Sequence, residues 1–136
     1  MIKKSAERKG RPDLPADPKK AMGALKAPLQ LIPSIANEHL AYGLEEGRRK
    51  YGFYNWRHTD VEMLTYIGAM KRHIDKIIDG EWYDSDVSFR DLEGKKSHLG
   101  AIMACCAILL DADKQGALID NRPQERGDTN AEGGTE

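Results

Sequence analysis

The sequence has few of the features that mark secreted, membrane or nucleic-acid-binding proteins. Only two of its 136 residues are cysteines, and they are adjacent. Neighbouring side chains on a helix diverge by about 100°, so this pair can neither close an ordinary disulfide nor ligate one ion. The longest apolar run, 99–110, is about half the ~20 residues that span a membrane. The first residues are charged with no apolar segment behind them, so we expect no signal peptide and a soluble, cytoplasmic protein.

The charge is nearly balanced overall but uneven along the chain. Lys and Arg number 21 against 22 Asp and Glu, a formal net charge of -1, which argues against a strongly basic nucleic-acid-binding protein. Residues 1–21 form a basic, proline-rich arm that we expect to be extended rather than helical. Residues 124–136 form an acidic tail that we expect to be disordered. The folded domain is therefore predicted to span 22–123.

Three helical patterns in this domain predict an all-α fold. The first covers 34–51, with apolar and small residues on one face. The second follows a capping box at 59–62 and ends at Gly80. The third covers about 97–113. No segment shows sustained alternation of apolar and polar residues, so no strand is expected, and 80–96 is predicted to be an irregular loop.

The third helix is apolar on all sides, which predicts that it lies at the centre of the fold. An apolar ladder also runs along the second helix, through Met63, Ile67, Met70, Ile74 and Ile77. Together these surfaces exceed what one small domain is expected to cover. We therefore predict a small helical bundle that is completed by oligomerisation.

Common catalytic motifs are missing from the sequence. It has no Cys/His zinc spacing, P-loop, nucleophile elbow or dinucleotide-binding glycine motif, which removes the usual kinase, hydrolase and dehydrogenase interpretations. Carboxylates remain as candidates: Glu38 and Glu45 share one face of the first helix, and six more acids precede the third helix at positions 79, 81, 84, 86, 91 and 93. Oxygen ligands of this kind suit Mg²⁺, although a solvated acidic surface gives the same pattern.

A second candidate is the stretch 48–58, where cations alternate with aromatic rings. Such a stretch can neutralise phosphates and stack a base, or it can simply anchor two helices. His73 and His98 lie beside apolar faces, where a histidine is either structural or a contact to a phosphate or a metal.

Taken in order along the chain, these segments resemble the dATP/dGTP diphosphohydrolase family. The resemblance covers about 22–123, and its most distinctive part is Lys50-Tyr51-Gly52 followed by Asn55-Trp56-Arg57. It continues through Arg72-His73, Gly80-Glu81 with Asp84, and His98-Leu99. The family is similar to the MazG-like all-α nucleoside triphosphate pyrophosphohydrolases. In size and layout the chain resembles their short MazZ type, which acts on dGTP in phages.

The resemblance implies Mg²⁺- or Mn²⁺-dependent hydrolysis of dGTP, or else dATP, to a nucleoside monophosphate and pyrophosphate in phage purine nucleotide metabolism. It also implies a homo-oligomer, a dimer or tetramer with sites between subunits, acting in the host cytoplasm with no membrane or stable nucleic-acid partner. The residues it assigns to catalysis and metal binding are Glu38, Glu81 and Asp84. Those assigned to substrate binding are Lys26, Lys50, Asn55, Trp56, Arg57, His73 and His98.

The main alternative is a non-catalytic module that binds nucleotides or single-stranded nucleic acid through the basic arm and the aromatic stretch. The acids favour the hydrolase, because a non-catalytic binder of anions has no use for carboxylates facing its basic residues.

Overall fold

The computed structural model describes residues 10–125 and divides the chain into two units, Met1–Pro33 and Ser34–Glu136. Each unit is described by itself. Most of the predicted acidic tail, 124–136, and the first residues of the predicted arm lie outside the described residues.

The first unit contains one short helix, α1 (Pro18–Gly23), and a 3₁₀ turn, η2 (Leu29–Leu31). The expectation that the proline-rich arm is extended rather than helical was wrong for this stretch. Proline is tolerated in the first turn of a helix, where its missing N–H would have no partner, and Pro18 occupies that position. The side chain of Asp17 caps the turn by accepting from the Lys19 amide at 3.0 Å.

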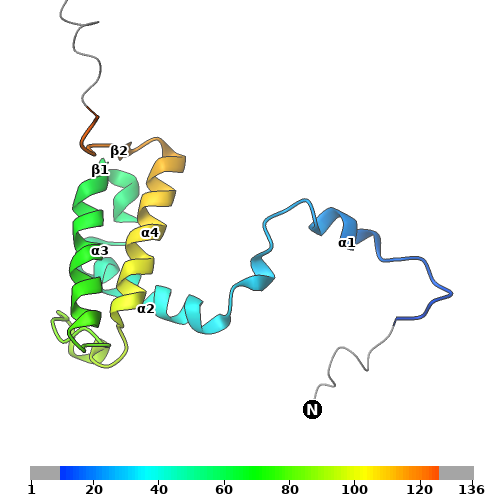
Figure 1. The fold of residues 1–136 in the computed structure, drawn as a ribbon, viewed down its shortest axis with the longest axis horizontal. Coiled ribbons are helices and arrows are strands. Elements are labelled where there is room, and N and C mark those ends of the chain that lie inside the picture. Colours follow the sequence, from blue (N-terminus) through cyan, green and yellow to red (C-terminus); the bar gives the residue numbers. More distant parts are fainter. Residues whose placement is uncertain (1–9, 126–136) are drawn as a thin grey trace, which may run out of the picture. The chain divides into compact units, whose positions relative to one another are not determined.

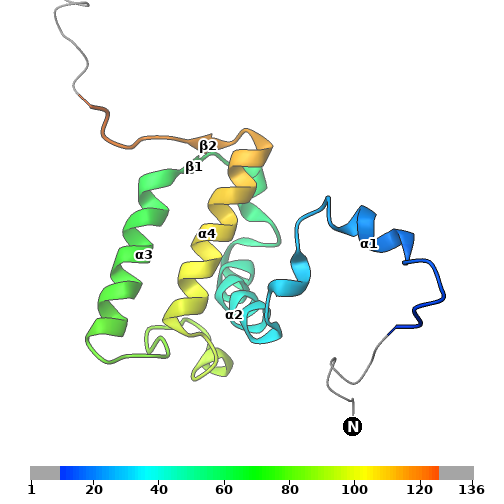
Figure 2. The same ribbon diagram turned by 45° about the vertical axis from the view of Figure 1, so that its right-hand side comes forward.

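The second unit is built on three helices, α2 (Ser34–Tyr51), α3 (Met63–Ile78) and α4 (His98–Gln115). Both α2 and α3 pack against α4, and α3 runs antiparallel to α4 (Figures 1 and 2). Two 3₁₀ turns, η3 (Asn55–His58) and η4 (Arg90–Leu92), interrupt the connecting segments. The all-α class and the central place of the third helix are therefore confirmed.

The ends of α4 follow ordinary capping rules. Ser97 precedes the helix and its hydroxyl accepts from the Gly100 amide at 2.9 Å. Gly116 ends it in the left-handed conformation, with φ of 74°, which glycine adopts without strain. The predicted end at Asp113 was two residues short of the observed Gln115.

The capping box predicted at 59–62 is wrong. Val61 and Glu62 form a short strand, β1, that pairs in parallel with β2 (Leu118–Ile119), and Glu62 makes no side-chain cap to α3. This pair lies at the end of the bundle where α3 begins and α4 ends (Figures 1 and 2). The irregular segment between α3 and α4 lies at the opposite end of the bundle. It covers the part of the chain where a loop was predicted over 80–96.

Small residues let α2 and α4 cross closely. A Cβ atom built on Gly43 would overlap the carbonyl group of Gly100, and one built on Gly100 would overlap the carbonyl of His39. The buried apolar residues are correspondingly few and mostly small: Val61, Leu92, Ala101, Ala104 and Ala112. Within the described residues no helix is long and apolar enough to cross a membrane.

Candidate active site

The segment that follows α3 is fastened to the first turn of α4. The His98 amide donates to the Trp82 carbonyl and the Asp84 amide to the Lys96 carbonyl, each at 2.9 Å. Tyr83 and Ser97 pair as an isolated antiparallel bridge. These bonds fix Glu81 and Asp84 beside the start of α4.

A chain of hydrogen bonds joins Glu81 to two histidines. Glu81 Oε1 lies 2.9 Å from His98 Nε2, and His98 Nδ1 lies 2.8 Å from His73 Nδ1 on α3. The Ser85 amide also donates to Glu81 at 3.0 Å. The bonds from Ser85 and from His98 lower the pKa of Glu81 to about 2, so its carboxylate is ionised at neutral pH.

A buried ion network adjoins this chain. Lys96 Nζ lies 3.0 Å from Glu46 Oε1 and 3.4 Å from Asp84 Oδ2, and all three residues are buried. Burial raises the pKa of the Glu46 carboxyl, but hydrogen bonds from the Ser88 amide and Lys96 outweigh it, so the net pKa is lowered. Lys50 reaches the same carboxylate at 3.6 Å. Pairing offsets part of the cost of removing Glu46, Asp84 and Lys96 from water, and Lys50 approaches the network from an exposed position.

A cavity of about 290 Å³ opens beside the network. Its polar lining comes from Glu46, Lys50, His73 and Lys96, and its apolar lining includes Ala69, Ala101, Ala104 and Ile108. Anionic and cationic side chains thus share one concave surface, which is what binding of a phosphate together with a cation requires.

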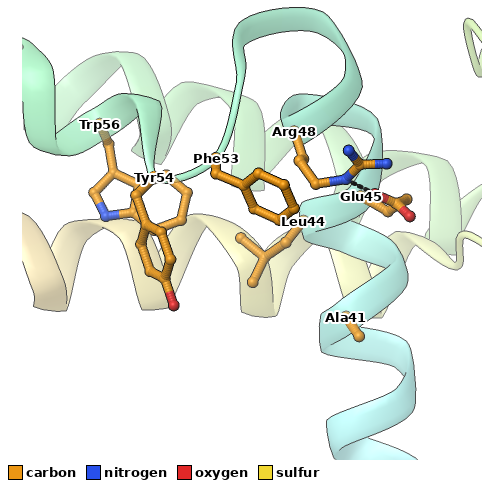
Figure 3. Close-up of a pocket in the computed structure, with 7 residues that line it drawn as sticks. All are labelled: Ala41, Leu44, Glu45, Arg48, Phe53, Tyr54 and Trp56. Carbon is orange, nitrogen blue, oxygen red and sulfur yellow. Dashed lines mark hydrogen bonds and ion pairs between the residues drawn. The ribbon is translucent and has the colours of Figure 1, made fainter.

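A larger and more apolar pocket, of about 700 Å³, is lined by the aromatic stretch after α2 (Figure 3). Phe53, Tyr54 and Trp56 line it from one segment, and Leu44 and Arg48 line it from α2. Arg48 bonds to Glu45 and lies 5.0 Å from the centre of the Phe53 ring. Tyr54 and Trp56 lie with ring centres 5.3 Å apart. Flat rings with a cation nearby can take up a planar base.

Asp111, near the end of α4, holds the aromatic stretch to the central helix. It accepts from Trp56 Nε1 at 2.7 Å and from Arg57 through two bonds of 2.8 Å. The bonds from Arg57 and Trp56 lower the pKa of Asp111 to about 2. The guanidinium of Arg57 is therefore already paired with a carboxylate.

The other residues assigned from the sequence lie apart from the histidine cluster. Glu38 is exposed near the start of α2, and no interaction joins it to Glu81 or Asp84 among the residues that the structure describes. Asn55 is half-buried at the start of η3. Lys26 is an exposed residue of the first unit. The structure thus brings together Glu81, Asp84, His73 and His98, with Lys50 lining the adjoining cavity.

Three site residues were missed in the sequence: Glu46, Lys96 and Asp111. A signal existed for Glu46, since it lies four residues before Lys50 on the same helix and i,i+4 pairs of opposite charge meet. Lys96 and Asp111 gave none, because their partners are dozens of residues away in the chain.

The donor atoms fit a divalent cation. One ligand atom from each of His73, Asp84 and His98 lies within 4.8 Å of the other two, so the three residues could hold one ion. Between 10 and 125 no other such group of three is found. Two imidazoles and one carboxylate are a ligand set found in metalloenzymes.

The chain is thus a helical protein in which a histidine–carboxylate cluster adjoins a cavity with charged side chains, and an aromatic pocket lies on α2 and the segment after it. The chain matches the family described as "dATP/dGTP diphosphohydrolase, N-terminal" over residues 16–122, and it belongs to that family. Neither the curated proteins nor the solved structures gave a match. The resemblance found in the sequence is therefore confirmed at the level of the family.

Proposed function

We propose that the protein is a divalent-cation-dependent diphosphohydrolase of purine deoxynucleoside triphosphates that releases pyrophosphate and prefers dGTP. The observation that carries the proposal is the family match over residues 16–122, since the family's description gives hydrolysis of dATP and dGTP. The histidine–carboxylate cluster beside a cationic cavity supports it, because cleavage of a phosphoanhydride needs both kinds of group.

The cavity beside the ion network is the proposed phosphate site. Lys50 and Lys96 line it, and each lies within 4 Å of the Glu46 carboxylate. Their ammonium groups would attract the β- and γ-phosphates and stabilise charge that develops on the leaving pyrophosphate. Glu46 holds both lysines in place, so a substrate does not have to order them.

Asp84, with Glu38 as the sequence predicts, is the proposed acidic ligand for Mg²⁺ or Mn²⁺, and Glu81 is proposed to support the site through His98. A bound cation of this kind lowers the pKa of a water ligand and neutralises phosphate charge. Glu81 is held ready by the Ser85 amide and by His98, and Asp84 by the Asp86 amide at 2.9 Å. Both carboxylates therefore keep one orientation before substrate arrives.

The aromatic pocket is the proposed base site. Tyr54 and Trp56 line the pocket with broad rings that favour a purine over the smaller pyrimidine. Asn55 lies between them in the chain, at the start of η3 and not in the pocket lining, and is proposed to offer amide groups for the base edge. Hydrogen bonds to a base edge discriminate better than the size of a pocket does, so Asn55 would account for a preference between dGTP and dATP.

Product analysis tests the proposal directly. The protein is incubated with each of dGTP, dATP, dCTP and dTTP plus Mg²⁺ or Mn²⁺, and products are separated by chromatography. We expect a monophosphate and pyrophosphate from the purines, fastest from dGTP, and no turnover in EDTA. Orthophosphate as the first product, a preference for a pyrimidine, or full turnover in EDTA would contradict it. Glu62→Gln changes an exposed residue of β1 and serves as the control variant for purification and assay.

A further inference from the structure

His73 and His98 face each other in a part of the fold where packing alone would favour apolar side chains. His98 is 1% exposed and Asp84 is 8% exposed, while His73 is half-buried and lines the cavity. Their three ligand atoms converge within 4.8 Å. Burying two imidazoles and a carboxylate is costly unless each is hydrogen-bonded, and here the hydrogen bonds also hold their donor atoms close together.

The hydrogen bonds define which nitrogen of His98 is available. Glu81 Oε1 accepts from the Ser85 amide, and a carboxylate oxygen of this kind is an acceptor for His98 as well, so His98 Nε2 carries the hydrogen between them at 2.9 Å. A carboxylate that orients a ligating histidine through its other ring nitrogen is the usual support of a metal-bound imidazole. Glu81 thus turns His98 Nδ1 towards His73 and Asp84.

The two facing nitrogens share a single hydrogen. His98 Nδ1 and His73 Nδ1 lie 2.8 Å apart, so one of them donates and the other accepts. With both rings neutral and a hydrogen on His98 Nε2, the shared hydrogen lies on His73 Nδ1. A dication that binds both Nδ1 atoms requires this hydrogen to move to His73 Nε2.

Asp84 keeps capacity for a ligand despite its neighbours. Oδ1 accepts from the Asp86 amide at 2.9 Å, and Oδ2 lies 3.4 Å from Lys96 Nζ. Each carboxylate oxygen has two lone pairs, so both oxygens can take a further partner. The carboxylates of Glu46, Asp84 and Glu81 outnumber Lys50 and Lys96 by one, which leaves negative charge for a cation.

We propose that His73, Asp84 and His98 form a metal site that takes a first-row transition-metal dication, Mn²⁺, Co²⁺ or Zn²⁺, in preference to Mg²⁺ or Ca²⁺. Imidazole nitrogen suits the transition metals, whereas Mg²⁺ and Ca²⁺ are bound through oxygen. In this site Glu81 is a positioning residue for His98 rather than a ligand, and the two histidines bind the ion rather than the substrate. The inference rests on the proposed function only in that the enzyme needs a cation.

Binding of Co²⁺ to the full chain, without nucleotide, tests the site. Co²⁺ in mixed nitrogen and oxygen ligation absorbs visible light, so a titration gives stoichiometry and affinity together. We expect one site per chain, displaced by Zn²⁺ and not by a large excess of Mg²⁺. His73→Gln and Asp84→Asn should each weaken binding by at least about ten-fold, and Glu81→Gln by about 10–100-fold, the range typical of groups that support a ligand. His58→Gln, an exposed histidine of η3, should bind as wild type does.

Two outcomes would overturn the site: unchanged Co²⁺ binding in both His73→Gln and His98→Gln, or displacement of Co²⁺ by equimolar Mg²⁺. Circular dichroism identifies a variant that fails to fold. If His98→Gln fails to fold, His73→Gln still tests the site, because His73 is only half-buried. Co²⁺ binding in a protein that cleaves no nucleotide would leave the metal site standing and reject the proposed function. Full Mg²⁺-dependent cleavage by the two histidine variants would leave the proposed function standing and reject the metal site.

Discussion

Trp56 Nε1 donates to Asp111 Oδ2 at 2.7 Å and thereby ties the aromatic stretch to the central helix α4. Arg57 bonds to the same carboxylate through two of its nitrogens. One acid thus orients Trp56 of the proposed base site and the neighbouring Arg57, although it lies more than fifty residues away in the chain.

This tie predicts how stability depends on acid. The pKa of Asp111 is lowered to about 2 in the folded chain, below the value of about 3.9 expected when unfolded. A lowered pKa stabilises the fold above the unfolded value, and that contribution is lost as the pH falls from about 5 towards 2. Asp111→Asn should therefore lower the Tm most above about pH 5, and the difference from wild type should shrink towards pH 2.

Thermal unfolding of both proteins across this pH range checks the prediction. Asp113→Asn is the matched control, because Asp113 is exposed two residues further along the same helix. A difference in Tm between wild type and Asp111→Asn that is the same at every pH would show that the carboxylate charge is irrelevant.

The family resemblance makes a separate prediction for Glu38. Glu38→Gln should lower kcat/KM for dGTP by about 100-fold, the scale on which loss of one electrostatic group acts in catalysis. Glu38 is exposed on α2, so the change should leave Tm unaltered and any loss will be catalytic. Steady-state kinetics with a melting curve for the same sample measure both quantities. Wild-type rates would remove Glu38 from the site.

The close crossing of α2 and α4 predicts opposite effects for two glycines. Gly43→Ala places a methyl group against the Gly100 carbonyl and should destabilise the fold by about 1–3 kcal/mol, the usual cost of overpacking. Gly47→Ala, one turn later, meets nothing within 4 Å and should stabilise the helix by about 0.5–1 kcal/mol. Denaturant unfolding measures both. Equal changes in the two variants would mean that the crossing is looser than the structure shows.

Exposed apolar side chains predict self-association. Leu110 of α4 is 72% exposed and Ile78 of α3 is 75% exposed, although both helices pack in the bundle. We expect light scattering to give a dimer or a tetramer of 15.2 kDa chains. Leu110→Glu should shift the mass towards the monomer, whereas Gln115→Glu, which adds the same charge to an exposed position, should not. A wild-type monomer that is stable and active would contradict the prediction.

The sequence predicted what depends on local pattern. The helix over 34–51 follows from its apolar face, and the helix predicted over about 97–113 from its continuous apolar run, although α4 continues to Gln115. The capping box failed because Val61 and Glu62 bond instead to a strand more than fifty residues later, and local propensity carries no information about such a partner.

The candidate site also contains residues that local pattern indicates and residues that depend on distant partners. Glu81, Asp84 and the two histidines were identified by residue type and by order along the chain. Their grouping depends on the turn after α3, where backbone bonds from Asp84 and His98 set the positions. Glu46 was not identified because its role depends on Lys96, fifty residues away and equally buried. Burial of an ion pair is a tertiary property.

The central helix carries contacts for both halves of the proposed site, His98 in its first turn and Asp111 near its last. Thirteen residues separate them, or about 20 Å along the axis at 1.5 Å per residue. Inserting one residue between them would turn Asp111 by about 100° away from Trp56 and break the tie. We therefore expect family members to keep the number of residues from His98 to Asp111 fixed.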